Sequence, residues 1–158
     1  MLIRRMTVED IPAVAEIENQ CFSLPWSDKS FEDSLLREDT IFLVCEDDSM
    51  TTNGEHSSER TGAVLTGYMG LYISFDEASV TNVAVSPVCR KRGYGEALVV
   101  AAKTAAKEAG AECIFLEVRV SNAPAISLYK KLGFEELGIR KKFYEHPVED
   151  AIIMKVGI

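Results

Sequence analysis

The feature that most constrains the fold is a strand, a basic glycine-containing turn, a helix and a second strand, which follow one another in mid-chain. Val83-Ala84-Val85 ends an apolar strand, and Arg90-Lys91-Arg92-Gly93-Tyr94-Gly95 opens a helix. That helix, over Gly93–Ala109, is rich in good helix formers and ends at a glycine. Cys113–Val118 is then a β-type run. A strand-helix-strand crossover of this kind predicts an α/β architecture.

The flanking sequence adds antiparallel strands and shorter helices to this centre. Capping residues, apolar spacing of three to four, and β-branched runs mark these elements. In chain order they are a strand at Leu2–Arg5, helices at Val8–Phe22 and Ser27–Arg37, strands at Ile41–Cys45, Ala63–Ile73 and Ala78–Val85, and, after Cys113–Val118, a helix at Asn122–Leu132 and a strand pair at Phe134–Tyr144 and Asp150–Val156. One domain over residues 1–158 is expected, with the polar stretch 47–61 as a long, mobile surface loop.

The basic turn has the chemistry of an anion site. A helix N-terminus offers free N–H groups and the positive end of the helix dipole, and glycines allow close approach of the backbone. The segment does not match the P-loop, and Leu98 stands where a dinucleotide fingerprint needs its third glycine. Taken alone, the turn is equally compatible with an ordinary basic loop at a helix start.

Composition limits the remaining classes. A net charge of −8, from 25 acidic and 17 basic residues, disfavours broad nucleic-acid binding. No apolar run approaches the roughly 20 residues that span a bilayer, and the N-terminus does not resemble a secretory signal, so a cytoplasmic protein is expected. The four cysteines form no C-x-x-C pair and lack histidines at ligand spacing, so no metal is expected.

Several segments together resemble one enzyme family. Arg90-x-x-Gly93-x-Gly95 matches the Gln/Arg-x-x-Gly-x-Gly/Ala signature of the GNAT N-acetyltransferase superfamily in its strand-turn-helix context. The chain is most similar to the ribosomal-protein alanine N-acetyltransferase (RimI) group of that superfamily. This likeness continues through Pro25-Trp26-Ser27, Asp76-Glu77-Ala78, Leu116–Ile126, Leu128–Phe134, Tyr144 and Glu149–Met154, and only 47–61 looks foreign to it.

The resemblance implies a mostly antiparallel central sheet flanked by helices, in which two parallel strands splay apart to hold acetyl-CoA. Those strands are the one ending at Val85 and the one containing Glu117. By the same resemblance, the backbone of the Val83-Ala84-Val85 segment binds the acetyl and pantetheine end. The amides of Lys91, Arg92, Gly93, Tyr94, Gly95 and Glu96 hold the pyrophosphate, although Glu96 departs from the basic or neutral residue frequent in the group.

Acetyl transfer requires an amine to lose a proton and a thiolate to gain one. The resemblance makes Glu117 the candidate general base and Tyr129 the candidate acid, with Asn122 binding the pantetheine arm. Each has a structural alternative: Glu117 faces solvent or pairs with Arg119, Tyr129 packs helix on sheet, and Asn122 caps a helix. Tyr144 and Glu18 are weaker candidates for the acceptor groove, since a glutamate in a first helix is usually exposed. Cys89 lies beside the motif, but direct attack by the amine needs no acyl-enzyme.

The resemblance predicts acetylation of a protein N-terminus, of alanine type, on a ribosomal protein. Acetylation of a lysine or a small-molecule amine is the alternative within enzymes. A non-catalytic module that senses acetyl-CoA is the alternative of another class, and the presence of both Glu117 and Tyr129 counts against it.

Overall fold

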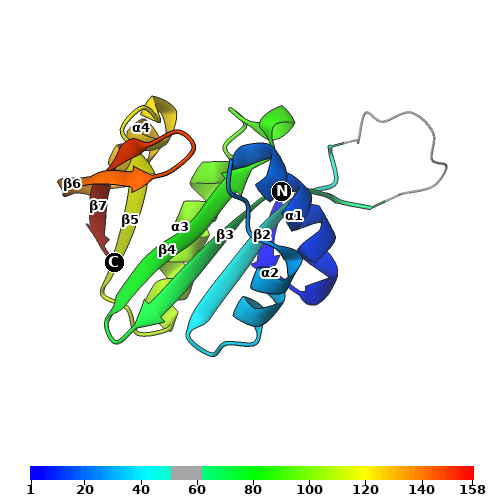
Figure 1. Ribbon diagram of the computed structural model, residues 1–158. Coiled ribbons are helices and arrows are strands. Elements are labelled where there is room, and N and C mark those ends of the chain that lie inside the picture. The colour runs from blue at the N-terminus through cyan, green and yellow to red at the C-terminus, as the bar shows by residue number, and fades with distance from the viewer. Residues whose placement is uncertain (51–61) are drawn as a thin grey trace.

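Seven strands form one mixed sheet in the computed structural model, which describes residues 1–50 and 62–158 (Figure 1). Their order across the sheet is β1-β2-β3-β4-β5-β7-β6, and every neighbouring pair is antiparallel except β4 and β5. The strands are β1 Leu2–Arg5, β2 Thr40–Asp47, β3 Val64–Ser74, β4 Glu77–Val85, β5 Cys113–Arg119, β6 Glu135–Tyr144 and β7 Glu149–Gly157.

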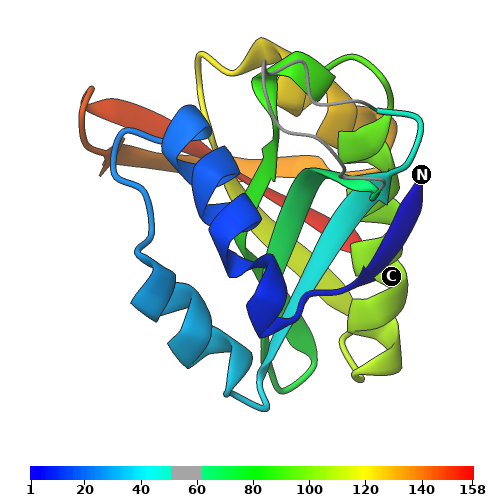
Figure 2. The same cartoon turned by 90° about the vertical axis from the view of Figure 1, so that its right-hand side faces the viewer.

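Helices cover both faces of this sheet. Helices α1 and α2 lie on one face and α3 on the other, as Figure 2 shows, while α4 lies beside β5 and β7 at the end where β4 finishes (Figure 1). The helices are α1 Ile11–Cys21, α2 Asp28–Leu35, α3 Tyr94–Glu108 and α4 Ala123–Lys131, with short 3-10 turns η1 Val8–Asp10 and η2 Pro87–Cys89.

The helix starts follow from their capping residues. The Ser27 side chain accepts a hydrogen bond from the backbone of Ser30, and Asn122 does the same for Ala125 at the start of α4. At the first turn the Asp10 carboxylate accepts from the Thr7 N–H at 2.8 Å, which completes a capping box.

Two apolar clusters divide the core according to the face of the sheet. The larger one joins α3 and α4 to the sheet and includes Leu98, Leu116 and Tyr129. The smaller one joins α1 and α2 to the opposite face and includes Phe31 and Tyr68. Because strand side chains alternate between faces, the adjacent residues Val83 and Ala84 of β4 contribute to different clusters.

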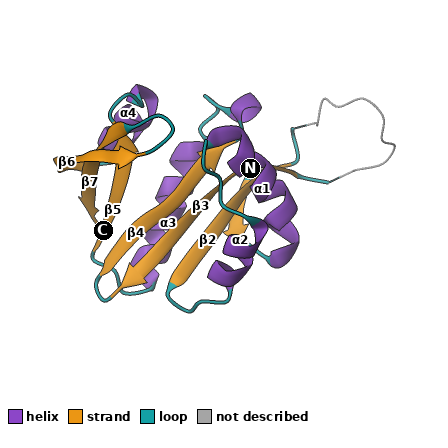
Figure 3. Cartoon of the chain, in the orientation of Figure 1, coloured by secondary structure: helices purple, strands orange, loops and turns teal. Residues whose placement is uncertain are grey.

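The parallel pair at the centre is short. β4 and β5 pair only through Glu77–Ser79 and Cys113–Phe115. β4 continues for six residues beyond Ser79 and β5 for four beyond Phe115, and there the two strands diverge (Figure 3). A bulge on β4 accompanies the divergence, because Gly70 and Leu71 of β3 pair with Asn82 and Val80, which leaves Thr81 unmatched. The result is the expected split between β4 and β5.

The element order predicted from the sequence is confirmed, with shifts at boundaries. The strand expected at Ile41–Cys45 runs on to Asp47, which is only 8% exposed rather than part of a mobile loop. Asp47 is retained there because its carboxylate accepts from the Ser49 N–H at 2.9 Å and from the Tyr94 hydroxyl at 3.0 Å. Residues 51–61 lie outside the described part of the chain. They make up most of the loop expected at 47–61.

Candidate active site

The N-terminus of α3 lies at the open end of the split, directly after β4 and η2. Its first intrahelical bond runs from the Ala97 N–H to the Gly93 carbonyl at 3.0 Å. The N–H groups of Tyr94, Gly95 and Glu96 precede this bond, so the helix ladder does not use them. They and the helix dipole form an anion-attracting end, as the sequence predicts.

Left-handed backbone shapes the turn that leads into α3. Lys91 has φ 61° and Gly93, the N-cap, has φ 85°. Gly93 has open space where a Cβ would stand, so its requirement for glycine comes from the backbone angle and not from crowding. At Gly95 a Cβ would meet Leu128 and Val85 at 3.5 and 3.7 Å, which is ordinary contact.

The basic residues of the turn, Arg90, Lys91 and Arg92, are all exposed, and two of them donate to neighbouring groups. Arg90 donates to the Val85 carbonyl at 3.3 Å and to the Cys21 sulfur at 3.4 Å, and Arg92 donates to the Met50 sulfur at 2.9 Å. Glu96 accepts from the Lys131 ammonium at 2.7 Å, so its charge is offset by a cation from α4. This pairing reduces the effect of the acidic residue that departs from the family pattern.

The end of β4 forms one wall of the split. Val83 and Val85 pack toward the core on the α3 side, and Ala84 toward the cluster under α1. β3 pairs with all three residues on the other side of the strand. Their opposite backbone edge is not paired with β5 and faces the split.

β5 forms the second wall and carries Glu117. Its neighbours Leu116 and Val118 are buried in the α3-side core, so Glu117 points to the other face, where α1 and α2 lie. The Glu117 side chain is 26% exposed, and its Oε1 lies 3.5 Å from Nη1 of Arg140 on β6. The expected alternative pairing with Arg119 is wrong, because Arg119 forms its ion pair with Glu149 at 3.3 Å.

The charge of the Glu117 carboxylate acts on the phenol of Tyr144, and Tyr144 in turn acts on Tyr129. Burial, followed by Tyr144, raises the pKa of Tyr129 above the ordinary phenol value. Burial, followed by the charge of Glu117, raises the pKa of Tyr144 to about 12, against the opposing effect of Arg119. The Arg119 guanidinium carbon lies 4.3 Å from the centre of the Tyr144 ring. Both phenols therefore keep their protons at neutral pH, and Tyr129 also packs on Phe134 as its structural alternative requires.

The other candidates have clear positions. Asn122 is exposed and accepts from the Ala125 N–H at 3.3 Å, which is its capping role. Cys89 is 2% exposed in η2. Glu18, a weak candidate for the acceptor groove with an exposed position as its alternative, is 1% exposed in α1, so the alternative is wrong. Its carboxylate accepts from the Trp26 N–H at 3.0 Å and from the Tyr68 hydroxyl.

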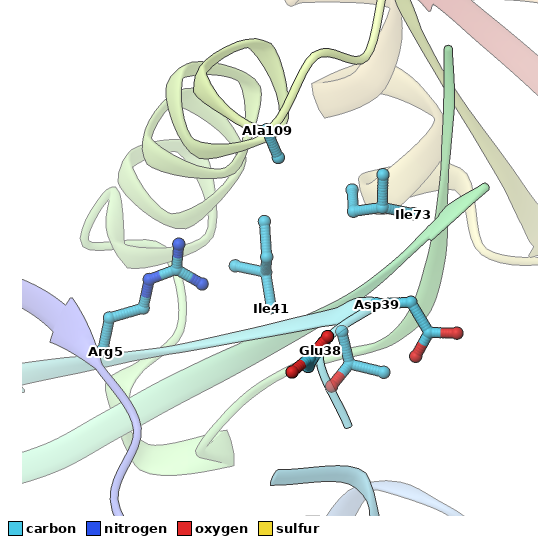
Figure 4. A pocket seen from close by; sticks show the side chains of 7 residues that line it. Arg5, Glu38, Asp39, Ile41, Ile73 and Ala109 are labelled. Atoms are coloured by element: carbon cyan, nitrogen blue, oxygen red, sulfur yellow. The ribbon is translucent and has the colours of Figure 1, made fainter. Parts of the chain in front are cut away.

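A surface hollow lies away from these residues. It has a volume of about 540 Å³ at the end of the sheet remote from the α3 N-terminus, where Arg5, Thr40 and Ile73 meet Ala109 (Figure 4). None of the candidate residues lines it.

Within residues 1–50 and 62–158, no group of His, Cys, Asp and Glu side chains is arranged to hold a metal ion. In the same residues, no helix has the length and apolarity to cross a membrane.

Comparison with known proteins decides the family. The model of the acetyltransferase (GNAT) family matches residues 11–134, which contain both walls of the split and the α3 N-terminus. The chain belongs to the acetyltransferase (GNAT) family. GNAT enzymes use acetyl-CoA as the acyl donor, and the anion-attracting turn beside the split suits the diphosphate of that molecule.

Two full-length relatives are named for the same activity. The chain is 41% identical over 157 residues to a candidate ribosomal protein bS18-alanine N-acetyltransferase of Bacillus subtilis, covering 99% of this chain and 95% of that protein. It is 33% identical to the ribosomal protein bS18-alanine N-acetyltransferase of Escherichia coli, covering 99% and 97%. The crystal structure of the Escherichia coli enzyme superimposes with a TM-score of 0.80, covering 99% of this chain and 93% of that one.

Three residues at this GNAT site received no role from the sequence. Arg140, the partner of Glu117, lies 23 positions away on an edge strand, and no spacing rule links the two. Tyr68 on β3 donates to Glu18, and Asn82 on β4 lies beside Tyr68. The sequence signal that could have singled out Asn82 is its position as a lone amide in the apolar run that ends β4.

Proposed function

We propose that this chain transfers the acetyl group of acetyl-CoA to the α-amino group of a protein N-terminus, of alanine type, on a ribosomal protein. The observation that carries the proposal is the split between β4 and β5, which has the α3 N-terminus at its open end and Glu117 on one wall. The full-length relatives in Bacillus subtilis and Escherichia coli support the acceptor. A ribosomal acceptor places the reaction in the cytoplasm.

The cofactor is held largely by backbone in this proposal. The N–H groups of residues 91–96 bind the pyrophosphate, and the unpaired edge of Val83-Ala84-Val85 binds the acetyl and pantetheine end. Asn122 lies at the start of α4 with its amide nitrogen available to the pantetheine arm, while its oxygen caps the helix. Backbone binding explains why an acidic residue is tolerated at Glu96.

The chemistry is a direct transfer in a ternary complex. The neutral amine attacks the thioester carbonyl, the C–N bond forms, and the C–S bond breaks. Glu117, directly or through one water, accepts the proton that the amine loses. Tyr129, protonated because its pKa is raised, gives its proton to the departing thiolate. Cys89 has no part in it, since its thiol is buried.

The test compares three short peptides, one beginning with alanine, one with methionine and one with acetyl-blocked alanine and an internal lysine. Release of CoA is measured with acetyl-CoA in excess. The alanine peptide is expected to react best, and mass spectrometry should locate the acetyl group on its α-nitrogen. Preferred reaction of the blocked peptide at lysine would overturn N-terminal specificity. Binding of acetyl-CoA without reaction of any peptide would favour the sensor alternative.

A further inference from the structure

A chain of buried polar side chains joins α1 to β4 beneath the split. Glu18 in α1 is 1% exposed, and its carboxylate accepts from the Tyr68 hydroxyl on β3 and from the Trp26 N–H in the segment between α1 and α2. Burial and the contact with Glu18 raise the pKa of Tyr68, so its hydroxyl keeps its proton. The Tyr68 hydroxyl therefore donates its proton to Glu18, and its oxygen can still accept a hydrogen bond from another group.

Asn82 on β4 is the next member of this chain. Asn82 lies diagonally across from Tyr68, because Tyr68 pairs with Ala84 and Asn82 stands two positions before Ala84 on the same face. Its side chain opposes the rise in the Tyr68 pKa, which is the effect of a nearby N–H donor. Because the Tyr68 hydroxyl donates its proton to Glu18, its oxygen can meet the NH₂ end of the Asn82 amide but has no proton to give to Oδ1. Asn82 is 7% exposed, and within the described residues its Oδ1 is the only buried side-chain oxygen or nitrogen without a hydrogen-bond partner.

Such an atom in a native fold requires an explanation, because a buried carbonyl without a donor is costly. Its position gives one. Asn82 lies three residues beyond Ser79, where pairing with β5 ends, and directly precedes Val83. It shares a face of the sheet with Ala84 and with Glu117 across the split, since both alternate with residues of the α3-side core.

We propose that Asn82 Oδ1 accepts a hydrogen bond from an N–H of the acceptor's α-amino group and so holds the amine beside the thioester. The inference rests on the proposed function and adds the residue that binds the nucleophile. The thioester brings no N–H donor, whereas a primary amine brings two or three. A primary amine can donate to Asn82 and still present a proton to Glu117 on the opposite wall.

Tyr68 and Glu18 act through Asn82 and are positioning residues. Tyr68 determines which end of the Asn82 amide faces the split, and Glu18 orients the Tyr68 hydroxyl by accepting its proton in a hydrogen bond. Because Glu18 also holds the Trp26 N–H, the same carboxylate ties the segment between α1 and α2 to the strand that binds the amine. Loss of the Tyr68 hydroxyl removes the bias between the two amide orientations.

The experiment measures steady-state kinetics of Asn82→Ala and Tyr68→Phe with the alanine peptide, together with acetyl-CoA affinity by calorimetry. Asn82→Ala should lower kcat/KM for the peptide about tenfold or more, mainly through KM, and leave acetyl-CoA affinity within twofold. Tyr68→Phe keeps the ring that packs edge-on against Phe31 and should shift peptide KM in the same direction by a smaller factor. Asn19→Ala, which removes an exposed amide from α1, is the matched control and should behave as wild type.

Each outcome bears on the proposal. An equal loss of acetyl-CoA affinity and peptide reactivity in Asn82→Ala would assign the orphaned oxygen to the cofactor and overturn the inference. Wild-type kinetics in a folded Asn82→Ala would overturn it as well, by showing that Oδ1 binds nothing needed for transfer. If the wild-type chain acetylates no α-amine, the proposed function fails instead, and the inference fails with it.

Discussion

Glu117 is a lone carboxylate on the wall of the split, and its proton-accepting role can be tested without altering packing. Glu117→Gln keeps the shape of the side chain but cannot accept a proton. We expect kcat near pH 7 to fall about 100-fold, in the range of general-base contributions. The loss should shrink toward pH 9, because a free α-amine has a pKa near 8 and deprotonates without help. The measurement is kcat against pH from 6.5 to 9.5.

The control for Glu117→Gln is Glu135→Gln, an identical change at an exposed position of β6. Its pH profile should follow wild type. Acetyl-CoA affinity should be unchanged in both variants. A Glu117→Gln enzyme with normal turnover and weakened cofactor binding would contradict the proposed base.

Tyr129 provides the second residue-scale prediction. Tyr129→Phe removes the hydroxyl and keeps the ring, which packs 5.6 Å from Phe134, so the fold should persist while kcat falls about 100-fold. The folded-state pKa of Tyr129 is raised, so the phenol stays protonated through pH 10 and its ionisation adds no alkaline limb below that pH. A fall in the wild-type rate between pH 8 and 10 that disappears in Tyr129→Phe would contradict the raised pKa of Tyr129. An unchanged kcat in folded Tyr129→Phe would contradict its role as the acid.

Residue-scale prediction from the sequence succeeded where a local rule applied and failed where the partner was distant. Asn122 caps α4, as its position before the helix predicts. An exposed position is the ordinary alternative for a first-helix glutamate such as Glu18, and it is wrong because Tyr68, 50 positions away, donates to the buried carboxylate. The pairing of Glu117 with Arg140 depends on the register of β5, β7 and β6, which local spacing does not contain.

At the scale of elements, the two ends of α3 offer a matched pair of glycines. Gly93 has φ 85° and Gly110 has φ 92°, and at both positions the space that a Cβ would occupy is open to at least 4 Å. Alanine held in the left-handed backbone of either position costs about 1 kcal/mol. In Gly93→Ala the free turn relaxes, and acetyl-CoA must restore the strained shape. We therefore expect roughly fivefold weaker acetyl-CoA binding in Gly93→Ala and unchanged binding in Gly110→Ala.

Thermal unfolding and calorimetry check this pair together. Gly110→Ala should lose about 1 kcal/mol of stability. Gly93→Ala should lose less stability, because its turn relaxes in the free protein, and only Gly93→Ala should lose affinity. Equal affinities would show that the turn at residues 91–96 is not the pyrophosphate site. A loss of affinity in both would point to a general effect of helix destabilisation.

The elements themselves were largely predictable because each has its own periodicity and boundary residues. Gly110 ends α3, and Ser27 begins α2, as local chemistry predicts. The end of β2 was not predictable from the sequence, because Asp47 belongs to a polar run and is held in the strand by Tyr94, 47 positions later. Local sequence rules also do not predict how far β4 and β5 pair, since the bulge at Thr81 depends on the register of β4 against β3.

At the scale of the whole molecule, the split leaves the sheet in two parts that touch through a short parallel ladder. β1 to β4 form one part and β5 to β7 the other, and only residues 77–79 and 113–115 pair across the boundary. Backbone groups beyond that ladder face the split without a strand partner. A ligand that enters there supplies the missing hydrogen bonds, so it should stabilise the native state as a whole.

We therefore expect acetyl-CoA at 100 times its Kd to add about 2.7 kcal/mol of stability. For a chain of this size that corresponds to a rise in Tm of roughly 5 to 10 °C. Hydrogen exchange should slow at Val80–Val85 and Leu116–Arg119, which border the split, and change little in β1. Pantetheine at the same concentration, which lacks the pyrophosphate, should give a much smaller rise in Tm. Equal stabilisation by both compounds, or protection centred on β1 and β2, would contradict binding between β4 and β5, because the diphosphate contact and the unpaired strand edges both lie at the split.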